Sequence, residues 1–163
     1  PDSIFDIAVV VSDPAWTTAL PDVERLCVES ALAVIGTATR PTELSIVLSS
    51  DAEIRILNRD YRSKDTATNV LSFPSGLSPE ISGTDMLGDV ILAYETVAAE
   101  AARDGKTLEA HLRHLVVHSD TITRRTAMLL RWSGVKSRYS PILALPTLTV
   151  RYWSRPNEFR SGE

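Results

Sequence analysis

The sequence predicts an α/β fold, a single domain in which helices pack on a small, mixed, four-stranded sheet. Segments rich in β-branched residues alternate along the chain with segments whose apolar residues recur at helical spacing. Such alternation is typical of α/β domains. The 163 residues are enough for one domain with a sizeable core. The apolar fraction of 44% and the charged fraction of 23% are those of an ordinary globular protein.

Four segments are predicted to be strands. Ile4–Val11 is rich in β-branched residues and is closed by a Ser-Asp-Pro turn. Glu43–Leu48 alternates and then becomes apolar, and Asn69–Phe73 precedes a proline. Leu87–Ala93 is the fourth. Residues 75–85 carry several Gly, Pro and Ser, so we expect a surface loop there.

Four further segments are predicted to be helices. Asp22–Ile35 places its apolar residues on one stripe and is followed by a glycine. Asp51–Asn58 follows a serine with the spacing of a capping box. Tyr94–Asp104 is composed of strong helix formers and also stops at a glycine. The last helix begins at Leu108, with Thr107 as its N-cap.

The composition predicts a protein without a membrane span. No apolar run approaches the roughly 20 residues needed to cross a bilayer, and no basic region followed by a hydrophobic run opens the chain. A cytoplasmic location is the expectation. The single cysteine, Cys27, lies in the apolar pattern of a helix, so we expect a buried thiol.

The charge of the chain changes sign after Ser119. Residues 1–119 contain nine Lys or Arg and 18 Asp or Glu, whereas residues 120–163 contain eight and three. The net charges are therefore −9 and +5. One interpretation of the basic tail is a nucleic-acid-binding arm. Its tryptophans and tyrosines follow no clear period, which leaves a second interpretation open.

All three histidines lie on the last predicted helix. His114 and His118 are one turn apart, and His111 precedes them. A two-histidine metal site on this helix is one possibility, but the pair lacks the glutamate of the metalloprotease pattern. No serine stands in a strand-turn-helix elbow, so nothing supports a Ser/His/Asp arrangement.

Three blocks together resemble the YbeY family of metal-dependent bacterial endoribonucleases. They are Asn58–Pro74, Leu87–Thr96 and His114–His118, and the resemblance covers roughly residues 4–118. It implies a zinc-dependent enzyme that cleaves single-stranded RNA, matures the 3′ end of 16S ribosomal RNA and takes part in ribosome quality control. The implied partners are single-stranded RNA, ribosomal RNA and the small ribosomal subunit.

The resemblance also implies roles for individual residues. It identifies Arg62 as the functionally important arginine near the cleft, where a guanidinium can bind an RNA phosphate. Arg59 and Lys64 would add positive charge. Asp65 and Asn69 would order the loop through local backbone hydrogen bonds.

The metal motif of the family is interrupted in this chain. The motif reads His-Gly-x-Leu-His-Leu-x-Gly-Tyr-Asp-His, and its three histidines leave a fourth zinc position for water. Only the first transfers, as His118; Ser119 replaces the glycine and Ile122 the second histidine. His114 would pack nearby and His111 would be solvated. A catalytically inactive RNA- or ribosome-binding remnant is therefore one alternative, and a misfolded gene product is another.

The tail is consistent with a changed reading frame. Asp120–Thr123 has codons of the form GAY-ACN-ATH-ACN, and read one base earlier these can encode Gly-Tyr-Asp-His. Leu143–Thr149 becomes compatible with Gly-x-Ala-Asp-Pro-Tyr, which resembles the ending common in the family. We infer a deletion of about five codons plus one base. The expected organisation is a truncated ribonuclease domain over residues 1–119 and an aberrant, poorly ordered basic tail over residues 120–163.

Overall fold

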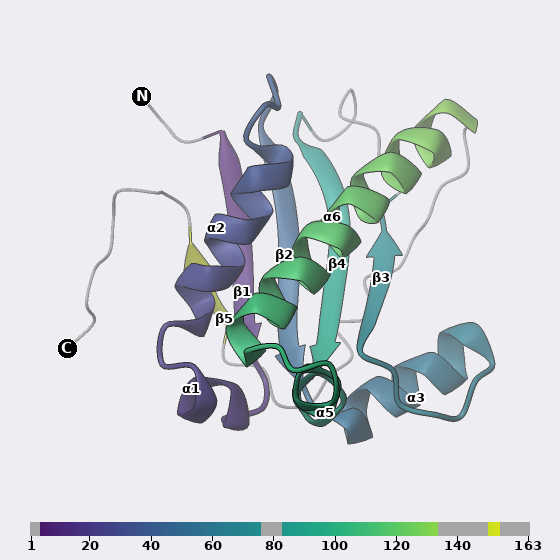
Figure 1. Cartoon of the computed structure of the whole chain (residues 1–163). Helices are drawn as coiled ribbons and strands as arrows, with labels where there is room; N and C mark the ends of the chain where they lie inside the picture. Colours follow the sequence, from purple (N-terminus) through teal and green to yellow (C-terminus); the bar gives the residue numbers. More distant parts are fainter. Residues whose placement is uncertain (1–3, 76–82, 134–149, 154–163) are drawn as a thin grey trace.

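The computed structural model describes residues 4–75, 83–133 and 150–153, and confirms the predicted α/β class. Helices and strands alternate over most of the chain (Figure 1). In chain order the elements are β1 (Phe5–Val11), α1 (Ala15–Ala19), α2 (Val23–Ile35), β2 (Thr42–Ser49), α3 (Asp51–Arg62), β3 (Val70–Pro74), β4 (Asp85–Ala93), α5 (Tyr94–Arg103), α6 (Leu108–Ser133) and β5 (Val150–Trp153).

The sheet is mixed, with the strand order β3-β4-β2-β1-β5. The central pairs β1–β2 and β2–β4 are parallel, and the two outer pairs are antiparallel. The four predicted strands are all present. β5 adds a fifth strand at the β1 edge, where its backbone pairs with Ile7–Val10. This strand was not predicted, because residues 120–163 were assigned to an aberrant tail.

The helices form two layers around the sheet. α2 and α6 cover one face, in front of the strands in Figure 1, and enclose the larger apolar core with β1, β2 and β4. α3 packs on the other face through Ile54 and Leu57. Cys27 lies in the larger core as the predicted buried thiol. In the described part of the chain, no helix is long and apolar enough to cross a membrane.

A glycine allows β3 and β4 to approach closely. Gly88 has a φ of 132°, a region that L side chains rarely adopt. A Cβ atom at this position would lie 2.2 Å from the carbonyl oxygen of Phe73. A register irregularity between β2 and β4 falls beside it, at Glu43/Leu44. This position therefore sets how β3, the edge strand that carries Phe73, joins the sheet.

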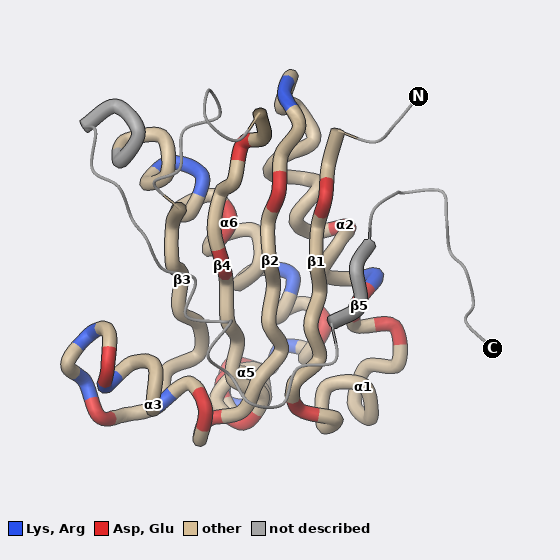
Figure 2. The backbone as a smooth tube through the Cα atoms, turned by 180° about the vertical axis from the view of Figure 1, so that it is seen from behind, with Lys and Arg blue, Asp and Glu red and all other residues tan. Residues whose placement is uncertain are grey.

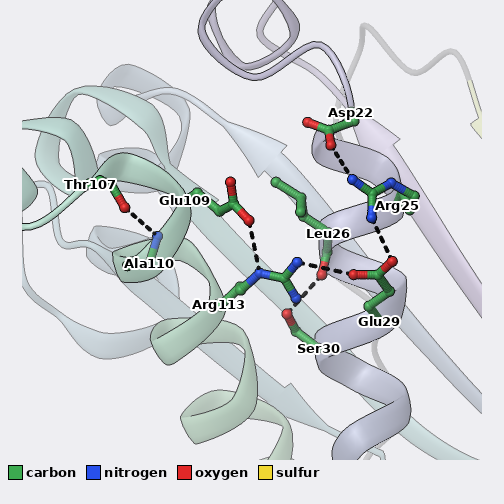
Figure 3. Close-up of polar contacts among 9 residues, drawn as sticks. All are labelled: Asp22, Arg25, Leu26, Glu29, Ser30, Thr107, Glu109, Ala110 and Arg113. Atoms are coloured by element: carbon green, nitrogen blue, oxygen red, sulfur yellow. Dashed lines mark hydrogen bonds and ion pairs between the residues drawn. The ribbon is translucent and has the colours of Figure 1, made fainter.

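A surface network joins α2 to the start of α6 (Figure 3). Arg113 of α6 donates to Glu29 of α2 at 3.0 Å and to Glu109 at 3.3 Å. Arg25 donates to Glu29 at 2.6 Å and also to Asp22. The hydrogen bonds from Arg25 and Arg113 lower the pKa of Glu29. The pairs are solvent-exposed, so they orient the two helices more than they stabilise them.

Two helices are longer than predicted. α3 continues to Arg62, beyond the predicted end at Asn58. α6 continues to Ser133, although order was expected to fall from about residue 120. No glycine or proline interrupts residues 120–133, and Thr123 and Ala127 are small enough to pack inward. Residues 134–149, which include the predicted Gly-x-Ala-Asp-Pro-Tyr counterpart, and 154–163 lie outside the described residues.

Candidate functional site

Arg62 lies in the last turn of α3, beyond the predicted end of this helix at Asn58. Its Nη2 donates to the carbonyl oxygen of Ser72 on β3 at 2.8 Å. Its Cζ lies 5.7 Å from the centroid of the Phe73 ring, which is cation–π distance. Neither contact is with a carboxylate. The strand therefore orients the guanidinium while its positive charge remains available to a phosphate.

The end of α3 is a well-defined turn. Ser63 adopts the left-handed conformation with φ 57°, and its N–H donates to the carbonyl of Arg59 at 3.1 Å. The buried side chain of Asn58 donates to the carbonyl of Thr66 at 2.9 Å. These bonds fold the following loop back onto the helix. Arg62 is thus held on a rigid support rather than on a flexible loop.

Two other arginines of α3 are paired with carboxylates. Arg55 donates to Asp65 through two bonds of 2.9 and 3.3 Å, and Arg59 donates to Asp60 at 3.0 Å. The hydrogen bond from Arg55 lowers the pKa of Asp65. The prediction that Asp65 orders the loop through backbone bonds is wrong, because it pairs with a side chain. Figure 2 shows the resulting mixture of basic and acidic positions along α3. Arg62 differs from both in having a neutral partner.

Figure 2 shows acidic positions on β1 and β2, near the end of the sheet that is away from α3. Asp6 and Glu43 are directly paired in the β1–β2 register. Partial burial raises the pKa of Glu43, and repulsion from Asp6 raises it further. These carboxylates would repel a polyanion from this end of the sheet.

The three histidines form a row along α6. The rings of His111 and His114 are stacked with centroids 6.4 Å apart, and those of His114 and His118 with centroids 6.2 Å apart. His114 and His118 are exposed, whereas His111 is only 6% exposed. The prediction that His111 is solvated is therefore wrong. The reason is tertiary: α5 packs against this part of α6 and covers the ring.

Glu100 of α5 ties His111 to the start of β3. Its Oε2 lies 2.8 Å from Nε2 of His111, and Asn69 Nδ2 donates to both carboxylate oxygens at 3.1 and 3.3 Å. Burial acts to raise the pKa of Glu100, but the bonds from His111 and Asn69 outweigh it, so the pKa is lowered. Asn69 was expected to bond to local backbone and instead contacts this carboxylate. No sequence pattern indicated Glu100, because its partners come from two other elements.

Replacing Glu100 with alanine is expected to lower the free energy of unfolding by about 2 kcal/mol, because His111 and Asn69 lose their partner in a largely buried site. Urea unfolding measures the change. Glu100→Gln keeps an acceptor and should lose less. Glu109→Ala, on the exposed surface of α6, is the control. Equal urea midpoints for Glu100→Ala and the unchanged protein would contradict the role assigned to this carboxylate.

The residues around His118 do not fit the zinc site that the resemblance implies. Within the described residues, no group of three His, Cys, Asp or Glu side chains is placed to hold a metal ion. Zinc in proteins needs at least three converging ligands, and among the described residues the one ring beside His118 is that of His114, which is parallel to it. One turn further on, Ile122 presents an exposed apolar side chain.

The buried face of α6 continues after His118, but its residue types change. The inward face changes from Leu112, Leu115 and Val116 to a carboxylate: Asp120 is fully buried, and both its oxygens lack a hydrogen-bond partner among the described residues. Burial raises the pKa of Asp120 to about 8. Apolar side chains instead face outward, with Leu129 65% exposed. Natural sequences rarely combine a buried, unpaired carboxylate with exposed large apolar side chains in one helix. This combination favours the inferred change of reading frame.

The fold and the site together define a class of protein. It is an α/β domain with a mixed sheet, a histidine-bearing helix on one face and an exposed arginine at the end of a helix on the other. The family profile described as Endoribonuclease YbeY matches residues 17–120. The chain belongs to this family. The match ends at Asp120, the residue at which a carboxylate enters the buried face of α6.

Relatives of the same description support this assignment. An Endoribonuclease YbeY of Paramagnetospirillum magneticum is 52% identical over 121 residues, covering 70% of this chain and 74% of the relative. One of Azorhizobium caulinodans is 46% identical over 118 residues, with the same coverages of 70% and 74%. A solution structure of a Thermotoga maritima protein covers 78% of this chain and 90% of its own, with 20% identity and a TM-score of 0.48. That likeness adds nothing to the assignment.

Proposed function

We propose that this protein is an endoribonuclease of ribosomal RNA processing that acts on single-stranded RNA, including the 3′ end of 16S ribosomal RNA. Ribosome quality control and association with the small ribosomal subunit belong to the same proposal, and such a substrate places the protein in the cytoplasm. The observation that supports it is Arg62, whose guanidinium is fixed by β3 without neutralisation. Relatives about half identical to the chain are described as endoribonucleases.

In this proposal, Arg62 binds the phosphate of the RNA bond that is cleaved. Hydrolysis of a phosphodiester increases negative charge on the phosphoryl oxygens, and a pre-oriented guanidinium stabilises that charge through bidentate hydrogen bonds. The Ser72 carbonyl takes one N–H donor of the guanidinium, which leaves donors for a phosphate. Zinc in the family would supply activation of water. The residues present around His118 do not fit it, so we derive no step through a metal.

A second candidate function is RNA binding without cleavage. The specific observation in its favour is the missing ligand set beside His118. The exposed arginine on α3 does not depend on that site, because α3 and α6 lie on opposite faces of the sheet. RNA binding is therefore expected to survive in the chain with this sequence even where cleavage does not.

Replacing Arg62 with alanine is expected to weaken binding of a single-stranded RNA oligonucleotide about tenfold and to reduce the slope of log K against log salt by about 0.7, the value for one phosphate contact on a single strand. Fluorescence anisotropy at several salt concentrations measures both. Arg59→Ala is the matched control, because that guanidinium is paired with Asp60 on the same helix. An unchanged salt slope in Arg62→Ala would show that Arg62 does not contact a phosphate.

The two candidate functions separate in a cleavage assay. The purified chain is incubated with end-labelled single-stranded RNA, with and without added zinc, and the products are resolved on a denaturing gel. Zinc-dependent fragments support the enzyme, and binding without fragments supports the second candidate. Absence of RNA binding by the unchanged chain contradicts both.

A further inference from the structure

An exposed tyrosine lies beside the proposed phosphate contact. Tyr61 is 46% exposed in the last turn of α3, next to Arg62. Its ring meets Phe73 of β3 in an edge-to-face contact, with centroids 5.4 Å apart and planes at 75°. Such a contact occupies at most one of the two faces of the tyrosine ring. Half-buried Phe73 thus supports both Tyr61 and the guanidinium of Arg62.

This arrangement matches the chemistry by which proteins hold single strands. Unpaired bases stack on exposed aromatic rings while basic side chains follow the backbone phosphates, and stacking tolerates any base because every base has a π face. Tyr61 and Arg62 are adjacent in sequence and share one aromatic support. The loop after them is fixed by the Asn58–Thr66 bond. The platform is therefore formed before RNA arrives.

The charges nearby favour this position over others on α3. Arg55 forms an ion pair with Asp65, and Arg59 forms one with Asp60. These carboxylates would repel a phosphate. Ile56 is also exposed on α3, at 47%, but its side chain is aliphatic and has no π face on which a base could stack. In the described part of α3, only the segment at Tyr61 and Arg62 combines an aromatic ring with a cation that has a neutral partner.

We propose that Tyr61 is a nucleobase-stacking residue that binds one base of single-stranded RNA next to the phosphate held by Arg62. This inference rests on the proposed function, since it assigns a second contact for the same substrate. It predicts weak discrimination among bases at that position, because stacking reads the ring and not its hydrogen-bonding edge.

The test measures affinities for a single-stranded RNA oligonucleotide by fluorescence anisotropy. Tyr61→Ala is expected to weaken binding about tenfold, and Tyr61→Phe to keep nearly full affinity. Tyr61→Leu keeps an apolar contact with Phe73 but has no π face, so it should bind as weakly as Tyr61→Ala. Unlike Arg62→Ala, none of these variants should change the salt slope. Ile56→Ala is the control for an exposed apolar residue of the same helix, and thermal melting confirms that each variant is folded.

A second substrate separates stacking from an indirect effect. A set of RNA oligonucleotides carries one abasic nucleotide, each at a different position. The unchanged protein should bind one member of the set more weakly than the intact RNA, whereas Tyr61→Ala should bind that member and the intact RNA equally well. Equal affinity of Tyr61→Ala and the unchanged protein, or an equal abasic loss in both, overturns the stacking role and leaves the proposed function standing. Failure of the unchanged protein to bind RNA overturns both.

Discussion

Replacing Asp120 with alanine is expected to raise the free energy of unfolding by about 3 kcal/mol at neutral pH. The side chain is fully buried, and neither carboxylate oxygen has a hydrogen-bond partner among the described residues. Alanine removes the desolvated group and favours the helix. Most core substitutions destabilise, so a gain here would be distinctive.

The same residue determines how stability depends on pH. The folded pKa of Asp120 is about 8, raised by burial from an ordinary value of 3.8. Between these values the folded state binds a proton that the unfolded chain releases. The contribution of Asp120 to the free energy of unfolding is therefore most favourable below about pH 4, falls as pH rises toward 8, and levels off above it. Asp120→Ala should flatten this part of the curve, as should Asp120→Asn, which cannot ionise.

Urea unfolding at pH 5, 7 and 9 measures both effects. Thr121→Ala changes the neighbouring, exposed residue of α6 and should leave the pH dependence as it is. A lower free energy of unfolding for Asp120→Ala at pH 7 would contradict the burial of an unsatisfied carboxylate at this position.

Reinserting the roughly five codons and one base inferred to be missing after His118 is expected to raise the zinc content of the purified protein from a trace to about one zinc per molecule. The restored chain would carry Gly-x-Leu-His-Leu-x-Gly-Tyr-Asp-His after Val117 and His118, and so the two histidines that are absent here. A single imidazole holds zinc too weakly to be retained during purification, because affinity depends on several converging ligands. The expected change is thus from a trace to stoichiometric metal.

Metal analysis of the two purified chains by inductively coupled plasma mass spectrometry tests this. His118→Ala in the restored chain should return the zinc content to a trace, whereas His111→Ala should not, because His111 is bonded to Glu100. Stoichiometric zinc in the chain with the present sequence would overturn the conclusion that its residues do not fit the site. Sequencing the gene around the His118 codon is the direct check: the frame inference fails if no alternative frame there encodes Gly-Tyr-Asp-His.

Local patterns predicted most of the elements because the forces that set them are local. The Ser50 hydroxyl accepts from the N–H of Glu53 at 3.3 Å, as the capping-box spacing indicated, and Thr107 accepts from Ala110 at 3.1 Å. The end of α3 was missed because the residues that hold its last turn in place come from another element. Tyr61 contacts Phe73 of β3, and Arg62 donates to the carbonyl of Ser72. The extension of α6 was missed because the prediction gave no weight to the absence of glycine and proline from residues 120–133, which allows them to be helical.

The sequence by itself determined the α/β class, the strands β1 to β4, the three blocks that resemble the family and the absence of two metal-motif histidines, because each depends on residue identity and spacing along the chain. Tertiary structure alone decided which side chains meet. It buried His111 against Glu100, placed Arg62 and Tyr61 over one phenylalanine, and turned Asp120 into the core. Those outcomes depend on packing between elements distant in sequence, and periodicity within one element cannot report them.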